Sequence, residues 1–389
     1  MKRILLPVGG TVLAGGLLAA GLAGTAQAAP DWATDPMAVN NAAAVSVVDF
    51  WSASNNAALK KATAYYHDTT PTSWKSGGGY SPDGKPGSVV PIGGEKAASA
   101  KVKNINLPRT IGKVFWVDAS GQPKWASATS IQSKYRNLVA TAAHNVYDTA
   151  GTGDPKVLDK WVFVPAYYQG KAPYGIYVGK TAWTHYDFDV YEDYDRDYAF
   201  VTVYNGVLNN GQKQVTKAEY DGFTGPKWTA GGHYFIGLSK DAGRLGDNVG
   251  GQGFTWNQKT GQTVYVFGYP EGPHPDGDKP YTGVTPKWVY GKTSGKVYVS
   301  AAEKVEEHVG LKGALTPGAD GGPWVVKYNN AKRLGYVNGV TSLFGDQDKN
   351  GRYDLITSAY FDGETADIYK KAANVWSGRI VGPNGELYK

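Results

Sequence analysis

The chain contains no cysteine among its 389 residues and only two methionines. Without cysteine it has no disulfide, no cysteine-ligated zinc and no thiol nucleophile. Lysine and arginine are scattered without a run of five or six, so the sequence lacks the basic stripe of a nucleic-acid-binding surface. Beyond residue 22 no apolar segment is long enough to span a bilayer. We therefore expect no nucleic-acid partner and no thiol chemistry.

The rest of the composition is that of a large globular β protein. Hydrophobic residues make up 41% of the chain, and there are 27 Tyr, 12 Trp and 11 Phe, which excludes wholesale disorder. The 52 glycines and 21 prolines indicate many short strands joined by tight turns. The aromatic content also suggests carbohydrate binding, but its alternation along strand-like runs favours packing inside β-barrels.

The first 28 residues have the pattern of a secretory signal peptide. Lys2 and Arg3 precede an apolar run from residue 4 to residue 22, and small residues stand at Ala26 and Ala28, where signal peptidase reads them. Five glycines interrupt the run, which argues against a membrane anchor. We therefore expect secretion after cleavage near Ala28, no membrane attachment afterwards, and a formal charge of +4 in place of +6.

The remaining chain divides into a helical extension and two series of strands. Residues 39–66 keep helical spacing, and a polar, glycine-rich stretch follows, so residues 29–104 are expected to form a helical pro-segment or accessory region with a linker. The first series of strand-like runs is Lys113–Val117, Trp125–Ile131, Leu138–Ala143, Trp161–Ala166, Tyr174–Trp183 and Tyr198–Tyr204. The second series is His233–Leu238, Thr263–Tyr269, Lys287–Tyr290, Val297–Ser300, Trp324–Tyr328, Gly335–Leu343 and Ile356–Phe361.

These two series, joined by a glycine-rich stretch around residues 205–232, predict an all-β fold of two antiparallel six-stranded barrels. The expected boundaries are 105–215 for the first barrel and 216–389 for the second barrel with a C-terminal helix. A parallel α/β sheet is excluded, because it would need helices between the strands. The cleft between the barrels is the expected place for a peptide or protein ligand.

Three short segments carry the chemistry. Leu138 to His144 reads as an apolar strand that ends in a histidine, and Asp197 opens a second apolar strand. The segment Gly318-Ala319-Asp320-Gly321-Gly322-Pro323-Trp324 is a glycine-rich turn that enters a third strand. Each segment alone is ordinary for a β protein.

Together and in this order they resemble the secreted actinobacterial trypsin-like serine endopeptidases of chymotrypsin fold. The resemblance covers roughly residues 105–380, and further matching pieces are Ile111-Gly112-Lys113-Val114-Phe115, Phe267-Gly268-Tyr269-Pro270 and Gly339-Val340-Thr341-Ser342. It implies that His144 is the general base and that Asp197 orients it. It also implies an oxyanion hole at Gly318 and Asp320, and a substrate-binding wall at Ser342, Leu343 and Phe344.

The sequence departs from this family at the nucleophile, because Asp320 stands where the family has its serine. A carboxylate beside His144 pairs with the imidazolium instead of yielding a proton to it. The resemblance therefore predicts a pseudoprotease. Two alternatives stay open: an active endopeptidase that uses another group, such as Thr316 or a water at Asp320, and a decoy or inhibitor module that binds peptides or proteases.

One further motif concerns metals. Asp346, Asp348, Asn350 and Asp354 place oxygen ligands at intervals with a glycine at the sixth position, as in calcium loops, but the twelfth position holds Thr357 and not glutamate. The sequence favours a polar hairpin turn, and a weak structural Ca²⁺ site is the second interpretation. No other cofactor is expected.

Overall fold

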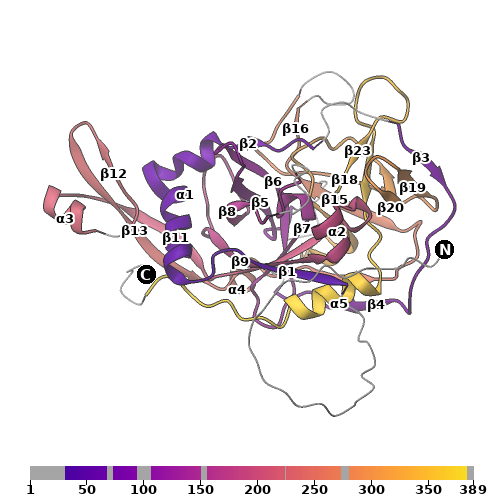
Figure 1. Ribbon diagram of the computed structural model, residues 1–389, viewed down its shortest axis with the longest axis horizontal. Coiled ribbons are helices and arrows are strands. Elements are labelled where there is room, and N and C mark those ends of the chain that lie inside the picture. The colour runs from indigo at the N-terminus through magenta and orange to yellow at the C-terminus, as the bar shows by residue number, and fades with distance from the viewer. Residues whose placement is uncertain are drawn as a thin grey trace, which may run out of the picture. The chain divides into compact units, whose positions relative to one another are not determined.

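The computed structural model describes residues 31–67, 73–93, 107–149, 156–223, 225–272 and 280–382, so the predicted signal peptide and its predicted cleavage site lie outside the described residues. The first half of the fold is a closed six-stranded antiparallel barrel (Figure 1). Its strands are β5 (Ile111–Val117), β6 (Pro123–Ile131), β7 (Leu138–Thr141), β8 (Asp159–Pro165), β9 (Tyr177–His185) and β10 (Ala199–Val203). They follow the order β9, β10, β7, β6, β5, β8, and β8 closes the ring by pairing with β9.

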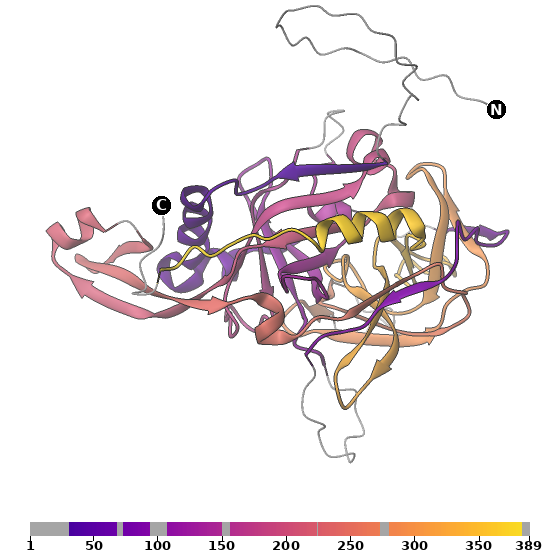
Figure 2. The same ribbon diagram turned by 90° about the horizontal axis from the view of Figure 1, so that it is seen from below.

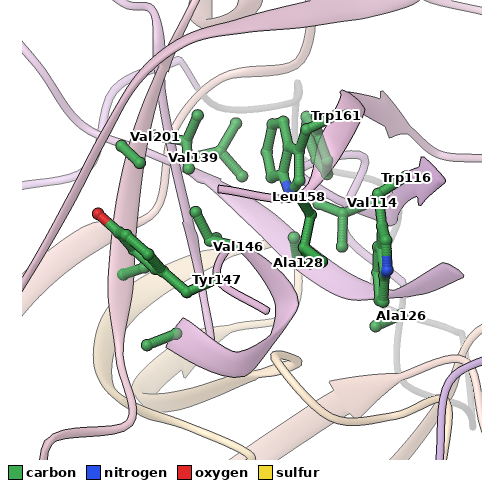
Figure 3. Close-up of a cluster of buried hydrophobic side chains, with 14 of the residues drawn as sticks. Val114, Trp116, Ala126, Ala128, Val139, Val146, Tyr147, Leu158, Trp161 and Val201 are labelled. Carbon is green, nitrogen blue, oxygen red and sulfur yellow. The ribbon is translucent and has the colours of Figure 1, made fainter. Parts of the chain in front are cut away.

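Strand β5 shows how alternation builds this barrel. All seven of its residues are buried, and successive side chains point to opposite faces. Val114 and Trp116 pack inside the barrel with residues of the other strands (Figure 3). Phe115 and Val117 belong to a second cluster on the outer face, which helix α1 (Asn41–Lys61) covers with Val48 and Trp51 among other residues.

The second half is more open. One sheet holds β14 (Gly253–Trp256), β15 (Thr263–Gly268), β18 (Lys287–Lys292), β21 (Pro323–Asn329) and β22 (Leu334–Val340). The other holds β19 (Val297–Ser300), β20 (Val305–Lys312), β23 (Phe344–Gly345) and β24 (Leu355–Ser358). Within the described ranges these sheets form a curled half-barrel and not a second closed cylinder, and β14 runs parallel to β22. The all-β class and the closed first barrel are confirmed. The second half differs from the expected closed antiparallel barrel, because its described strands form a curled half-barrel.

Strands of the N-terminal extension pair with strands of both halves of the fold. Its elements besides α1 are the strands β1 (Trp32–Pro36), β2 (Thr63–Ala64), β3 (Lys75–Gly77) and β4 (Gly87–Val89). They pair with β9, β6, β19 and β14, respectively. The polar stretch that the sequence predicted as a linker therefore adds edge strands, because backbone hydrogen bonds need no apolar periodicity.

A three-stranded arm, residues 206–243, projects from the barrel strands beside α1 in both ribbon views (Figures 1 and 2). It consists of β11 (Gly206–Val215), β13 (His233–Gly243) and β12 (Lys227–Ala230) in that order, with α3 (Lys217–Gly222) between β11 and β12. The sequence predicted a strand near residue 233 but assigned it to the second barrel. Alternation reveals a strand, whereas its partner depends on long-range pairing.

Short elements complete the fold. They are α2 (Tyr186–Tyr191), α4 (Leu245–Val249), α5 (Gly363–Ala372), β16 (Glu271–Gly272), β17 (Tyr281–Thr282) and the 3₁₀ turns η1 (Ala143–Asn145) and η2 (Tyr194–Arg196). Helix α5 is the expected C-terminal helix, and Asp362 caps its first turn through a capping box with Thr365. No helix in the described part of the chain is long and apolar enough to cross a membrane.

Candidate active site

His144 and Asp197 meet because their strands are neighbours. His144 lies in η1 directly after β7, Asp197 follows η2 directly before β10, and these strands pair with Ala199 opposite Thr141. The backbone N–H of His144 donates to Asp197 Oδ1 at 3.0 Å, and its Nδ1 lies 2.7 Å from Asp197 Oδ2. Both side chains are fully buried. The carboxylate therefore fixes the imidazole ring and its tautomer.

Ser342 completes this buried network from the second half. Its hydroxyl donates to Asp197 Oδ2, and its backbone N–H donates to the carbonyl of Thr357 at 2.8 Å. The sequence placed Ser342 at the substrate-binding wall, and the structure shows it as a hydrogen-bond donor behind the carboxylate. Three acceptor contacts on Asp197 keep this buried charge satisfied.

Asp320 faces His144 from the glycine-rich turn before β21. Its Oδ2 lies 3.4 Å from His144 Nε2, and its Oδ1 accepts the backbone N–H of Gly318 at 2.7 Å. Gly318 has φ +90, and a Cβ there would lie 2.7 Å from the carbonyl oxygen of Tyr269, so the turn requires glycine at this position. The backbone N–H of Ser127 donates to the carbonyl of Asp320 at 2.9 Å, which ties the turn to β6.

The electrostatics follow from these contacts. Burial alone lowers the pKa of His144, but the charges and hydrogen bonds of Asp197 and Asp320 raise that pKa to about 10. Burial alone raises the pKa of Asp197, but the His144 charge and the hydrogen bonds from His144 and Ser342 bring it below its usual value. These contacts favour the protonated form of the His144 imidazole, which lies between Asp197 and Asp320.

A segment of the N-terminal extension, residues 62–67, lies over His144, and we call it the cover segment. The rings of Tyr65 and His67 lie 5.8 Å and 6.0 Å from the His144 ring between centroids. His67 Nε2 lies 3.2 Å from Glu303 Oε2, and the Tyr194 hydroxyl lies 2.9 Å from His67 Nδ1. Pairing of β2 with β6 holds the segment in place. Sequence reasoning missed these residues, because none belongs to a motif.

The other residues predicted for the substrate-binding wall are covered as well. Leu343 is 1% exposed and Phe344 is 4% exposed. Trp74 of the extension donates from Nε1 to the carbonyl of Phe344 at 3.2 Å and stacks on His308 with nearly parallel rings. Trp74 of the N-terminal extension therefore packs next to the predicted substrate-binding wall.

Thr316, the alternative nucleophile, is directed elsewhere. It is fully buried, and its hydroxyl donates to the carbonyl of Glu271 at 3.0 Å. Among the described residues no hydrogen bond joins Thr316 to His144, whose Nε2 faces Asp320. Within the described part of the chain, His144 is therefore not placed to take a proton from the Thr316 hydroxyl.

The predicted calcium loop forms the connection between β23 and β24. Ligand atoms of Asp346, Asp348 and Asp354 lie within 4.8 Å of one another. Backbone N–H groups within the turn already bind these carboxylates: that of Asn350 donates to Asp346 Oδ1 at 3.2 Å, and that of Gly351 donates to Asp346 Oδ2 at 2.7 Å. This is the polar hairpin that the sequence favours, and the Ca²⁺ site stays a prediction.

Comparisons with known proteins agree with the fold. No protein-family model matches the sequence, and no curated protein is a significant match. The crystal structure of the protease Anisep from Arthrobacter nicotinovorans matches with a TM-score of 0.50 at 22% identity, covering 69% of this chain and 98% of Anisep. The thermostable serine protease AL20 from an extremophilic microorganism matches with a TM-score of 0.49 at 21% identity, covering 68% of this chain and 97% of AL20. At 22% identity the similarity to Anisep shows a common chymotrypsin-like fold.

Proposed function

We propose that the chain is a secreted trypsin-like-fold protein without peptidase activity, a pseudoprotease in which Asp320 has replaced the serine nucleophile. The observation that carries the proposal is the position of the Asp320 carboxylate. One oxygen takes the backbone N–H of Gly318, and the other lies beside His144 Nε2. The residues of the expected active site are thereby engaged with each other.

Each catalytic role is lost through these contacts. A carboxylate attack on an amide would pass through an anhydride and expel a poor leaving group, and His144 at a pKa of about 10 takes up no further proton at neutral pH. Asp320 Oδ1 occupies the Gly318 N–H, one of the two donors expected for the oxyanion hole. Loss of one such donor costs about 10²–10³ in turnover, and loss of the nucleophile in a related triad costs about 10⁶.

The direct test uses the full chain. Purified protein is incubated with casein, with fluorogenic peptides and with a serine-directed phosphonate, and the products are analysed by mass spectrometry. We expect no cleavage above inhibitor-treated controls and no labelled hydroxyl. Labelling of any serine or threonine, Thr316 above all, would overturn the proposal in favour of an active endopeptidase.

A second candidate is peptide binding without cleavage. It is favoured by one observation: the chain's own residues 62–67 lie against His144, with the backbone N–H of Tyr65 donating to the carbonyl of Trp125 at 2.9 Å. An extended polypeptide of suitable sequence would take the same place after the cover segment is displaced. Capture of a synthetic peptide comprising residues 60–67 by a variant with Tyr65→Ala and His67→Ala, and not by the native chain, would support this function.

Secretion and processing belong to the same proposal. N-terminal sequencing of protein recovered from the culture medium tests both the signal peptide and the removal of residues 29–104. We expect the extension to remain attached, because its four strands are paired with both halves of the fold.

A further inference from the structure

A cavity of about 640 Å³ lies between helix α1, the loop of residues 169–173 and the arm. Its walls come from residues 55–60 near the end of α1, from that loop, and from β11 and β12. The volume lies within the range of about 300–1,000 Å³ that is typical of small-molecule sites. None of its lining residues takes part in the site around His144.

The lining is rich in carboxamides, and none of the described residues that form it is acidic. The carboxamides are Asn55, Asn56, Gln169, Asn209 and Gln212. Each carboxamide donates and accepts hydrogen bonds at once, which matches the hydroxyl groups of a sugar. Lys60 and Lys171 add positive charge to the same wall, and no carboxylate among the described lining residues neutralises it.

Asn56 supplies an unpaired acceptor to this wall. The residue is 8% exposed, and its Nδ2 donates to the carbonyl of Gly170 at 3.1 Å. Its Oδ1 is buried and has no hydrogen-bond partner among the described residues. A buried acceptor without a partner is unfavourable, and a turn of the Asn56 side chain toward the cavity would let a ligand hydroxyl satisfy it.

The backbone around Asn56 is held in an unusual conformation. Ser54, Asn55 and Asn56 have φ values of +50, +57 and +61, a run of three residues in the left-handed region that interrupts α1. Lys60 Nζ donates to the carbonyl of Asn55 at 2.8 Å, and a Cβ at Gly170 would lie 2.5 Å from Lys60 Cγ. Strain of this kind persists where the surrounding structure fixes it, often at binding sites.

Trp228 of β12 gives the cavity an aromatic wall. Its indole is half-buried and stacks on Phe235 of β13, with centroids 6.0 Å apart and planes 14° from parallel. Phe235 therefore fixes the orientation of the indole. A pyranose ring presents a face of C–H groups that packs on such a ring, while its hydroxyl groups at the edge reach polar partners.

We propose that this cavity binds a sugar that carries a carboxylate, such as the hexuronate unit of an acidic glycan. The sugar ring stacks on Trp228, a hydroxyl donates to Asn56 Oδ1, and the carboxylate pairs with the lysines of the wall. The proposal does not depend on whether the chain is a pseudoprotease.

The test is calorimetric titration of the full chain with glucuronate, with glucose and acetate as matched probes. We expect glucuronate to bind at least about tenfold more tightly than glucose, and acetate to give no saturable heat. Trp228→Ala is expected to weaken glucuronate binding by about tenfold or more, whereas Trp376→Ala, which alters a tryptophan that is 48% exposed elsewhere, leaves it unchanged.

A charge reversal keeps the test decisive if Trp228→Ala disturbs the arm. Lys171 is exposed, so Lys171→Glu leaves packing intact, and we expect it to weaken binding of glucuronate but not of glucose. No saturable binding of glucuronate, equal affinity for glucose, or full affinity in both Trp228→Ala and Lys171→Glu would overturn the proposal.

Discussion

The carboxylate of Asp320 accepts the hydrogen bond of the backbone N–H of Gly318 at 2.7 Å. In a serine protease of this fold that N–H faces the carbonyl oxygen of the substrate and stabilises its developing charge. Here the side chain at the nucleophile position takes that donor for itself. If the proposed function holds, Asp320 affects both the nucleophile and the oxyanion hole, and Asp320→Ser is expected to restore both.

The first prediction concerns this reversal. Asp320→Ser in the native chain is expected to remain inactive, because Tyr65 and His67 still cover His144. Combined with Tyr65→Ala and His67→Ala, it is expected to raise hydrolysis of an activated ester by at least about 100-fold over the native chain. Ester hydrolysis is followed spectrophotometrically at neutral pH.

The matched control is Asp320→Asn in the same double-alanine background, which removes the charge without adding a nucleophile. It is expected to stay inactive. Equal hydrolysis rates for the serine and asparagine variants would contradict the prediction. It would also be contradicted if the serine variant were inactive while hydrogen exchange showed that residues 62–67 had detached from His144.

The second prediction concerns pH. The pKa of His144, at about 10, lies above the ordinary value of 6.5, so its stabilising contribution is fully present below about pH 6.5 and is lost as the pH rises toward 10. The free energy of unfolding by urea is expected to fall over this interval by an amount on the order of a few kcal/mol. In Asp320→Asn the decline is expected to be smaller, because one of the two partner charges is gone.

Asp118→Asn serves as the control for this measurement, since it removes the same charge at a partly exposed turn between β5 and β6. Its pH dependence between 6.5 and 10 is expected to match that of the native chain. A slope in Asp320→Asn equal to the native slope would contradict the assigned coupling between His144 and Asp320.

The third prediction compares a buried carboxylate with a surface one. Asp197→Ala leaves the buried His144 ring without its main partner and is expected to lower the free energy of unfolding by about 3–5 kcal/mol. Asp247→Ala breaks a partly exposed pair with Arg136 and is expected to cost about 1 kcal/mol or less. Urea unfolding at pH 7 measures both, and similar losses would show that burial of the His144 pair carries little energy.

The fourth prediction concerns Gly318, in the glycine-rich turn before β21. Gly318 and Gly121 have similar φ values, +90 and +79, but a Cβ at Gly318 would meet Tyr269 and Trp125, whereas one at Gly121 meets nothing within 4 Å. Gly121→Ala therefore measures backbone strain alone, about 1–2 kcal/mol. Gly318→Ala is expected to cost clearly more in urea unfolding, and equal losses would show that the turn has room for a methyl group.

Much of the first barrel was readable from the sequence, because its strands are long apolar runs bounded by turn residues. The run predicted at Lys113–Val117 is β5 (Ile111–Val117), and Trp125–Ile131 lies within β6 (Pro123–Ile131). The order of the three motif segments likewise predicted which residues meet at the site. Local pattern and family resemblance carry this information together.

The arm, the edge strands of the extension and the cover segment were not predictable in the same way. Strands β20 and β14 were missed, and β13 was placed in the second series of strands although it pairs with β11 and β12, because pairing depends on residues far away in the chain. Tyr65 and His67 reach His144 only through the pairing of β2 with β6. Nothing in the neighbourhood of residue 67 indicates that pairing.

The N-terminal extension, which pairs with both halves, affects the order in which the chain acquires its structure. Strand β1 can pair only after β9 has been synthesised. Strand β4 can pair only after β14, which lies more than 150 residues later in the chain. Such distant contacts slow folding, because long loops must close before the contact is gained. We expect the segment that is synthesised first to be among the last to dock, so that residues 62–67 cover His144 only after the rest of the protein has folded.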